Sequence, residues 1–187
     1  LTDGGPHGFN TDVGGIVRAL AEAGVAEAPR ARIVGAGATA TSALVALAER
    51  GARDVEVVAR RPEAVEALRP VADRYGLSLA AAPLAQPPAT DVPLTISTIP
   101  GGTELPADVT LALAEHGGTL FDVVYGHWPT TLATAWERAG GRALSGAGML
   151  LHQAVLQIRL FATGDVDEPL PDEDGVVAVM RRALVGD

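Results

Sequence analysis

The sequence contains no cysteine and no lysine, and all 14 of its basic residues are arginine. Without cysteine the chain forms neither disulfides nor thiolate metal sites, and its four histidines lack the His-x-x-x-His spacing of a metal centre. Long apolar runs are also missing, because none approaches the roughly 20 residues that cross a bilayer. No basic leader precedes an apolar stretch either. We expect a soluble protein with no metal ion and no membrane partner, and a reducing cytoplasm suits it.

Positive charge is scarce, with 14 basic against 23 acidic residues and a formal net charge of −9. Proteins that bind nucleic acid usually carry a basic face, so we expect no nucleic-acid partner. Hydrophobic residues make up 48% of the 187 positions, which is enough for one domain with a buried core. The chain begins with Leu1 rather than methionine, and we therefore expect that part of the protein precedes it.

Helical and strand-like patterns alternate along the chain. The expected helices lie at 11–24, after the glycines at 35–37 and ending at Gly51, and at 62–76, 106–116, 130–139, 147–163 and 173–184. The expected strands lie at 33–34, 54–60, 77–83, 93–99 and 118–125. This spacing gives parallel strands joined by right-handed crossovers. The predicted fold class is α/β, with a doubly wound, mainly parallel sheet flanked by helices.

The segment "GAGATA" fits the dinucleotide-binding pattern Gly-x-Gly-x-x-Gly/Ala between a strand and a helix. The first glycine permits a tight turn, the second lets the backbone approach a pyrophosphate, and Ala40 allows close packing of the helix. Phosphate oxygens would lie on the free N–H groups of the helix N-terminus. The candidate cofactor residues of this turn are Gly35, Ala36, Gly37, Ala38 and Thr39. The alternative is a tight strand-to-helix turn without a ligand.

Arg60 and Arg61 stand where NAD-binding proteins of this fold usually place an acid that holds the ribose 2′-hydroxyl. A guanidinium instead offers the donors that a 2′-phosphate needs, so the pair favours NADP over NAD. The alternative is two solvated arginines paired with Glu56 and Glu63.

The stretch "GFNTDVGG" places Asn10, Thr11 and Asp12 directly before an apolar, alanine-rich segment. Asn10 or Thr11 can cap a helix here, and Asp12 in the first turn suits the positive end of the helix dipole. Capping alone would account for all three polar residues, so the pattern by itself leaves their function open.

Six segments in the same order resemble the shikimate dehydrogenase family over nearly the whole chain. They are "GFNTDVGG", "GAGATA", "VVARRPE", "STIPGG", "FDVVYGHWPTTL" and "GAGMLLHQAV". The chain departs from the family where Ala59 and Arg61 replace Asn and Thr beside the coenzyme adenosine, and where Ala64 replaces a further Arg of many members.

The resemblance implies an NADP-dependent oxidoreductase of the shikimate pathway, which leads to the aromatic amino acids, with a Rossmann-type fold. It implies that Asp12 contacts the shikimate hydroxyls and takes part in proton transfer as the catalytic carboxylate. Asn10, Tyr125 and Gln153 match substrate-binding positions. The further cofactor positions that it implies are Ala59, Arg60, Arg61, Ser97, Thr98, Val123, Gly146 and Met149.

The family's catalytic lysine has no counterpart in this chain, because the sequence contains no lysine. The resemblance implies that the lysine belongs to an N-terminal substrate domain that precedes Leu1. Residues 1–187 would then form the NADP-binding domain, with 1–24 as a bridging segment and 147–187 as C-terminal helices that pack on the absent domain. We expect the chain alone to be inactive, with the apolar face of its last helix exposed or covered by a partner such as a second copy.

Two other functions remain compatible with the sequence. One is a quinate/shikimate dehydrogenase, because part of the specificity for ring substituents would lie upstream. The other is a non-catalytic dinucleotide-binding regulatory module. A Ser-x-Ser loop and a lysine in the upstream sequence would favour an enzyme over such a module.

Overall fold

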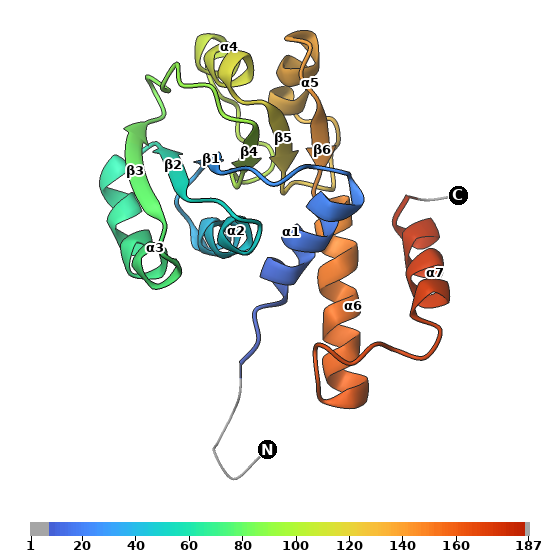
Figure 1. Ribbon diagram of the computed structural model, residues 1–187. Helices are drawn as coiled ribbons and strands as arrows, with labels where there is room; N and C mark the ends of the chain where they lie inside the picture. Colours follow the sequence, from blue (N-terminus) through green and yellow to red (C-terminus); the bar gives the residue numbers. More distant parts are fainter. Residues whose placement is uncertain (1–7, 186–187) are drawn as a thin grey trace.

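Strands alternate with helices through residues 8–185, the part of the chain that the computed structural model describes (Figure 1). The strands are β1 (Arg30–Val34), β2 (Asp54–Ala59), β3 (Ser78–Pro83), β4 (Leu94–Ser97), β5 (Thr119–Asp122) and β6 (Ala143–Ser145). The helices are α1 (Thr11–Glu22), α2 (Ala38–Glu49), the 3₁₀ helix η1 (Pro62–Leu68), α3 (Arg69–Tyr75), α4 (Ala107–His116), α5 (Thr131–Arg138), α6 (Ala147–Thr163) and α7 (Glu173–Val185). Within this range no helix has both the length and the apolar character needed to cross a membrane. Residues 1–7 of the bridging segment predicted at 1–24 lie outside the described residues, as do 186–187.

The six strands form one sheet in the order β3-β2-β1-β4-β5-β6, and every neighbouring pair is parallel. Ile33 of β1 pairs with Val57 of β2 on one side and with Ile96 of β4 on the other. The chain builds outward from β1 in both directions, which produces a switch point between β1 and β4. The predicted fold class, a doubly wound and mainly parallel sheet, is confirmed.

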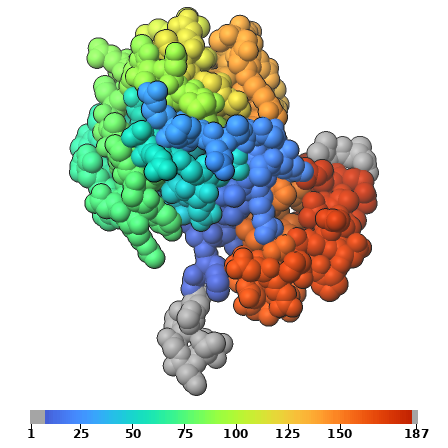
Figure 2. Space-filling view, in the orientation of Figure 1, coloured from blue at the N-terminus to red at the C-terminus, as the bar shows by residue number. Residues whose placement is uncertain are grey.

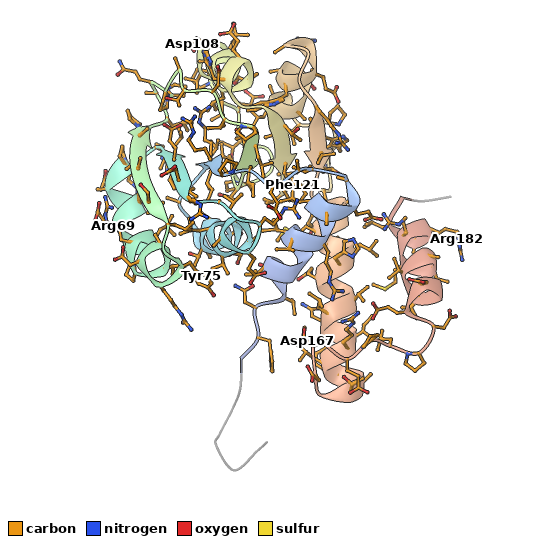
Figure 3. The ribbon with its side chains drawn as sticks, in the orientation of Figure 1. Arg69, Tyr75, Asp108, Phe121, Asp167 and Arg182 are labelled. Atoms are coloured by element: carbon orange, nitrogen blue, oxygen red, sulfur yellow. The ribbon has the colours of Figure 1, made fainter. Side chains whose placement is uncertain are left out.

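Each face of the sheet buries its own apolar cluster. On one face α1, α2, η1, α3 and α6 cover a cluster that includes Ile33, Leu44 and Phe121, and Phe121 is labelled within the sheet in Figure 3. On the other face α4 and α5 cover a cluster that includes Val34 and the fully buried Trp136. Ile33 and Val34 fall into different clusters because successive side chains of a strand point to opposite faces.

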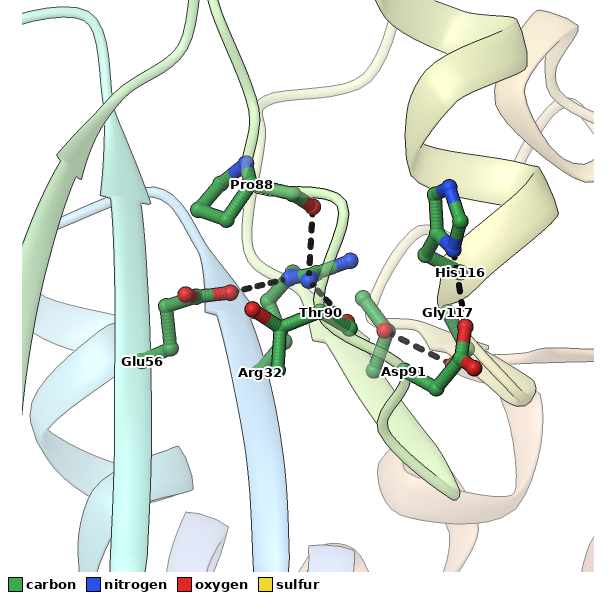
Figure 4. A network of polar contacts seen from close by, with 8 residues as sticks. Arg32, Glu56, Pro88, Thr90, Asp91, His116 and Gly117 are labelled. Atoms are coloured by element: carbon green, nitrogen blue, oxygen red, sulfur yellow. Dashed lines mark hydrogen bonds and ion pairs between the residues drawn. The ribbon is translucent and has the colours of Figure 1, made fainter.

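A proline-containing connector, residues 84–93, joins β3 to β4 without a helix. Arg32, which is fully buried in β1, holds this connector in place (Figure 4). Its Nε donates to Glu56 Oε2 at 2.7 Å, and its Nη2 donates to the carbonyl oxygens of Pro88 and Thr90 at 3.1 and 2.7 Å. A buried guanidinium is tolerated only with such partners. The arginine therefore fixes a segment that has no regular hydrogen bonding of its own.

Two segments differ from their predictions. The single helix expected at 62–76 is a 3₁₀ helix followed by α3, because Pro70 has no N–H to donate to the preceding turn. Strand β6 was not predicted at all. It has only three residues, all half-buried, and so carries no alternation that a sequence pattern could reveal.

Helices α1 and α6 pack with their backbones unusually close together. A Cβ added at Gly15 would lie 2.8 Å from the carbonyl oxygen of Met149 and 3.0 Å from the Cβ of Gln153. A Cβ added at Gly148 would lie 3.2 Å from the Cβ of Ala19. Gly15 of "GFNTDVGG" and Gly148 of "GAGMLLHQAV" are therefore the glycines that this helix contact requires.

Helix α7 is joined to α1 and α6 through ion pairs, and Figure 2 shows it as a lobe beside the main body. Arg159 of α6 pairs with Glu173 at 2.5 Å. Glu22 of α1 lies between Arg181 of α7 at 2.6 Å and His152 of α6 at 2.9 Å. The hydrogen bond from His152 and the neighbouring Arg181 hold the pKa of the Glu22 carboxyl below its usual value, with burial opposing them. These pairs fix one side of α7 against the two packed helices.

The contact between α1 and α6 predicts opposite outcomes for two neighbouring glycines. Gly15→Ala should lower the free energy of unfolding by about 1–3 kcal/mol, because the new methyl group meets backbone atoms that cannot rotate away. Gly14→Ala is the matched control, since its Cβ would meet only the Leu156 side chain, whose terminal Cδ1 is the close atom and can move. Urea denaturation of both variants measures the difference. Equal stability of the two variants would contradict the proposed backbone contact.

Candidate active site

Residues predicted to bind a cofactor follow the carboxyl ends of several strands. Because the strands are all parallel, those ends share one edge of the sheet. The glycine-rich turn follows β1, the two arginines follow β2, Thr98 follows β4, Val123 follows β5 and Gly146 follows β6. The fold thus brings together residues that lie more than a hundred positions apart in the sequence.

The glycine-rich turn leaves its second glycine open. Gly35 has a φ of 112°, and an added Cβ would lie 2.5 Å from Thr98 Oγ1, so only glycine fits there. Gly37 has no atom within 4 Å of an added Cβ and is exposed. Helix α2 begins at Ala38 without a side-chain cap. Its first N–H groups are therefore available to an anion, as the dinucleotide pattern requires.

Arg60 and Arg61 are both exposed directly after β2. Neither forms an ion pair with any acid in residues 8–185. The pairing of these arginines with Glu56, considered from the sequence, does not occur, because Glu56 is bound to Arg32 at 2.7 Å. Two cationic side chains without acidic partners therefore stand one strand away from the open glycine turn.

The structure separates the roles of the polar residues that open α1. Asn10 is the N-cap, because its Oδ1 accepts a hydrogen bond from the Asp12 N–H at 3.1 Å. Its Nδ2 donates to Ser42 Oγ of α2 at 3.0 Å. Thr11 is buried, and the Asp12 carboxylate accepts no hydrogen bond and forms no ion pair within residues 8–185. Capping therefore accounts for Asn10 but leaves the Asp12 carboxylate without a structural partner.

Gln153 lies against the first turns of α1. Gln157 Nε2 donates to Gln153 Oε1 at 3.3 Å and to Thr11 Oγ1 at 3.4 Å, so it links α6 to the start of α1. The structure therefore brings Gln153 to the helix that carries Asp12. Tyr125 belongs to the loop after β5, and its side chain is 55% exposed.

The turns after β5 and β6 are in backbone contact. The Gly146 N–H donates to the Val124 carbonyl at 2.9 Å, and a Cβ at Gly146 would lie 2.0 Å from the Val123 carbonyl oxygen. Of the remaining predicted cofactor residues, the side chains of Ala59, Ser97 and Met149 are buried. A ligand at this edge would therefore meet the backbone at Ser97 rather than its hydroxyl.

Asp122 at the end of β5 is a buried carboxylate that the sequence analysis assigned no role. Its side chain borders a cavity of about 210 Å³ that lies between the 99–105 loop and the start of α5. Burial raises the pKa of the Asp122 carboxyl, and hydrogen bonds from Thr130, the Val124 amide and Ser97 offset part of that rise. An acid at the end of an apolar strand, three residues before Tyr125, is the signal that points to it.

The raised pKa of Asp122 predicts a pH-dependent stability. The folded chain binds this proton more tightly than the unfolded chain, so the stabilising effect of the protonated acid is present at low pH and is lost as pH rises through the folded pKa. Relative to Asp122→Asn, the wild-type free energy of unfolding should fall as the pH rises above the ordinary aspartate pKa of about 4. Urea denaturation at several pH values measures the difference. A difference that is constant or grows with pH would contradict the assignment.

Comparisons with known proteins are consistent among themselves, although no family model matches the chain. The chain is 35% identical over 188 residues to the shikimate dehydrogenase (NADP(+)) of Methanothermobacter thermautotrophicus, covering 96% of this chain and 66% of the relative. The shikimate 5-dehydrogenase of Thermus thermophilus, solved in complex with NADP(H) and shikimate, aligns at 30% identity and a TM-score of 0.68 over 94% of this chain and 63% of that chain. The quinate dehydrogenase of Corynebacterium glutamicum in complex with NAD aligns at 26% identity and a TM-score of 0.76 over 95% of this chain and 62% of that chain.

The chain thus spans no more than about two thirds of the length of these relatives. Within that span, the parallel sheet with its glycine-rich turn and the sequence identity to the relatives point to the same family. The chain belongs to the shikimate dehydrogenase family.

Proposed function

We propose that the chain is the NADP-binding part of an oxidoreductase that interconverts shikimate and 3-dehydroshikimate. The observation that carries this proposal is the open Gly37 turn one strand away from two arginines that have no acidic partner within residues 8–185. The names of the relatives point the same way, since they are shikimate dehydrogenases and one was solved with NADP(H) and shikimate.

The cofactor would extend along the carboxyl edge of the sheet. Backbone N–H groups of Gly37, Ala38 and Thr39 would hold the pyrophosphate, because that helix start has no side-chain cap. Arg60 and Arg61 would hold the 2′-phosphate. The nicotinamide end would lie near the joined turns at Val123 and Gly146, where it would accept or donate the hydride. The fit of this edge to a dinucleotide rests on the absence of a Cβ at Gly37 and on the exposed guanidiniums.

The substrate would meet this part of the protein at α1, α6 and the loop after β5. Asp12 is the proposed proton-transfer carboxylate, since it is not engaged by any residue in 8–185. Asn10, Tyr125 and Gln153 are the proposed hydroxyl-binding residues. Several polar groups around one ring are what recognition of a polyol needs, and oxidation of an alcohol needs a base near the leaving proton.

The rest of the active site would lie in an N-terminal domain upstream of Leu1. Residues 1–24 would bridge to it and the helices of 147–187 would pack on it. Val179 and Leu184 of α7 are exposed by 57% and 36%, and these apolar side chains would then be covered, either by that domain or by a second copy of the chain. The proposed setting is the cytoplasm, within the biosynthesis of aromatic amino acids.

A second candidate is a dehydrogenase that acts on quinate as well. The similarity to a quinate dehydrogenase solved with NAD favours it. The two candidates differ in the nucleotide that the residues after β2 would prefer, and Arg60 and Arg61 favour the phosphorylated form.

The cofactor assignment predicts a selective loss of NADP affinity. In the 187-residue chain, replacing Arg60 and Arg61 together by alanine should weaken NADP binding at least about tenfold, because charge-assisted hydrogen bonds to the phosphate are lost. NAD, which lacks the 2′-phosphate, serves as the matched ligand and should bind both proteins alike. Calorimetric titration of both coenzymes measures the effect. Equal NADP affinity in the wild type and the variant would refute the assignment.

The substrate assignment predicts that Asp12 is needed for turnover and not for stability. In the chain extended upstream to the length of its relatives, Asp12→Asn should lower shikimate turnover by about a hundredfold or more, as expected for loss of a proton-transfer group. The free energy of unfolding should change by no more than about 1 kcal/mol, because Asn10 rather than the Asp12 carboxylate caps α1.

NADPH formation from shikimate at about 340 nm measures that turnover. The control is the unextended 187-residue chain, which lacks lysine and should give no measurable turnover. Undiminished turnover by the extended Asp12→Asn variant would leave Asp12 without a catalytic role.

A further inference from the structure

The loop between β5 and α5, residues 123–130, carries two of the residues assigned to the site, Val123 and Tyr125. Most of its side chains reach solvent, and the exposed Tyr125 hydroxyl has no hydrogen-bond partner within residues 8–185. No hydrogen bond of its own side chain within residues 8–185 therefore holds Tyr125, and the course of its backbone sets where the side chain lies. What holds that backbone determines where the tyrosine lies.

Asp122 joins the beginning of this loop to its end. The side chain is only 2% exposed. Its Oδ1 accepts the Val124 N–H at 3.3 Å, and its Oδ2 accepts the Thr130 hydroxyl at 2.8 Å. Thr130 Oγ1 in turn accepts the Ala133 N–H at 3.1 Å and so caps α5. One carboxylate therefore links the end of β5, the start of the loop and the first turn of α5.

The same loop contacts its neighbours at two further points. The Val124 carbonyl accepts the Gly146 N–H at 2.9 Å, so the loop supports the turn before α6. Trp128 packs in part against the apolar cluster under α4 and α5. The loop is thus anchored at its start by Asp122 and Gly146, near its end by Thr130 and Trp128, and Tyr125 lies between these anchors.

We propose that Asp122 is a positioning residue that closes the 123–130 loop and thereby sets the place of Tyr125 at the carboxyl edge of the sheet. The carboxylate is bound to the Val124 N–H and the Thr130 hydroxyl, and the role proposed for it acts through the loop rather than on the substrate. The effect on Tyr125 rests on the proposed function, whereas the effect on the loop does not.

The acceptor chemistry explains why an acid is used here. Val124 N–H and the Thr130 hydroxyl both donate, and a carboxylate accepts both without a donor of its own. An asparagine of the same shape has one acceptor and one NH₂ group. The NH₂ group would face Thr130, whose hydroxyl proton would then need another acceptor. Asp122→Asn therefore preserves volume but loses one of the two loop contacts.

The variants are chosen so that one interaction is tested from both ends. Asp122→Asn changes the acceptor, and Thr130→Val removes the donor while keeping the shape. Thr130→Ser keeps the hydroxyl and should behave like the wild type. Asp73→Asn is the matched control, because Asp73 is an exposed acid on α3, a helix that does not belong to the loop or to the elements that flank it.

The first measurement reports on the loop itself in the 187-residue chain. Asp122→Asn and Thr130→Val should each raise hydrogen exchange at the Val124 amide by about tenfold or more, because both break the Asp122–Thr130 bond that closes the loop carrying this amide. Acrylamide quenching should rise as well. That change reports Trp128, because the only other tryptophan, Trp136, is fully buried. Thr130→Val also removes the α5 cap, so the double variant should add little to Thr130→Val, as for two partners of one bond.

The second measurement reports on Tyr125 in the chain extended upstream. The KM for shikimate should rise by about tenfold in Asp122→Asn, with kcat within about threefold, because a binding group is displaced and the proton-transfer group is not. Unchanged exchange and quenching in both variants would overturn the proposal, whatever the kinetics. A loosened loop with an unchanged KM would overturn the link to Tyr125. Absence of shikimate turnover in the extended wild type would instead refute the proposed function and leave the loop result standing.

Discussion

The parallel pairing of all six strands is the constraint on which the site depends. A parallel sheet places the carboxyl ends of its strands at one edge, and the connections that leave that edge are the ones that carry the glycine turn, the arginines and the turns at Val123 and Gly146. No contact between these loops is needed to bring them together. Where loops do touch, as at Gly35 with Thr98 and at Gly146 with Val123, glycine is the only residue with room.

The contact of α1 with α6 adds a second set of residues to this edge. Because Gly15 admits the backbone of Met149, the first turn of α1 lies beside Gln153. Asn10 then fixes the start of α1 to α2 through Ser42, which lies in the helix that the glycine turn begins. The start of α1 and Gln153, which are proposed to meet the substrate, are therefore tied to α2, the helix that follows the glycine turn. The Asp12 carboxylate has no hydrogen-bond or ion-pair partner within residues 8–185, which suits the proton-transfer role proposed for it.

The sequence predicted well those features that local chemistry determines. "GAGATA" between a strand and a helix, the alternation of the first five strands with helices, and the span of the long helix at 147–163 all follow from patterns within a few residues, and the structure confirms them. Pro70 was visible in the sequence, but its effect on the helix at 62–76 depended on how the two turns around it pack.

Other features depend on contacts between distant residues and could not be predicted. Strand β6 has three residues and exists because β5 offers it an edge. Arg32 holds a connector 56 to 58 positions away, and no local pattern links the two. The bond from Thr130 to Asp122 is likewise set by the return of the chain into α5. The same limit applies to Asp12, because sequence alone could not decide which of the polar residues opening α1 acts as its cap.

A crystal structure of the 187-residue chain with NADP bound would test the central claim most directly. The account predicts the pyrophosphate on the N–H groups of Gly37, Ala38 and Thr39, the 2′-phosphate between the guanidiniums of Arg60 and Arg61, and the nicotinamide beside Val123 and Gly146. Difference density for the dinucleotide elsewhere, for example in the cavity beside Asp122, or a 2′-phosphate that touches neither arginine, would contradict it.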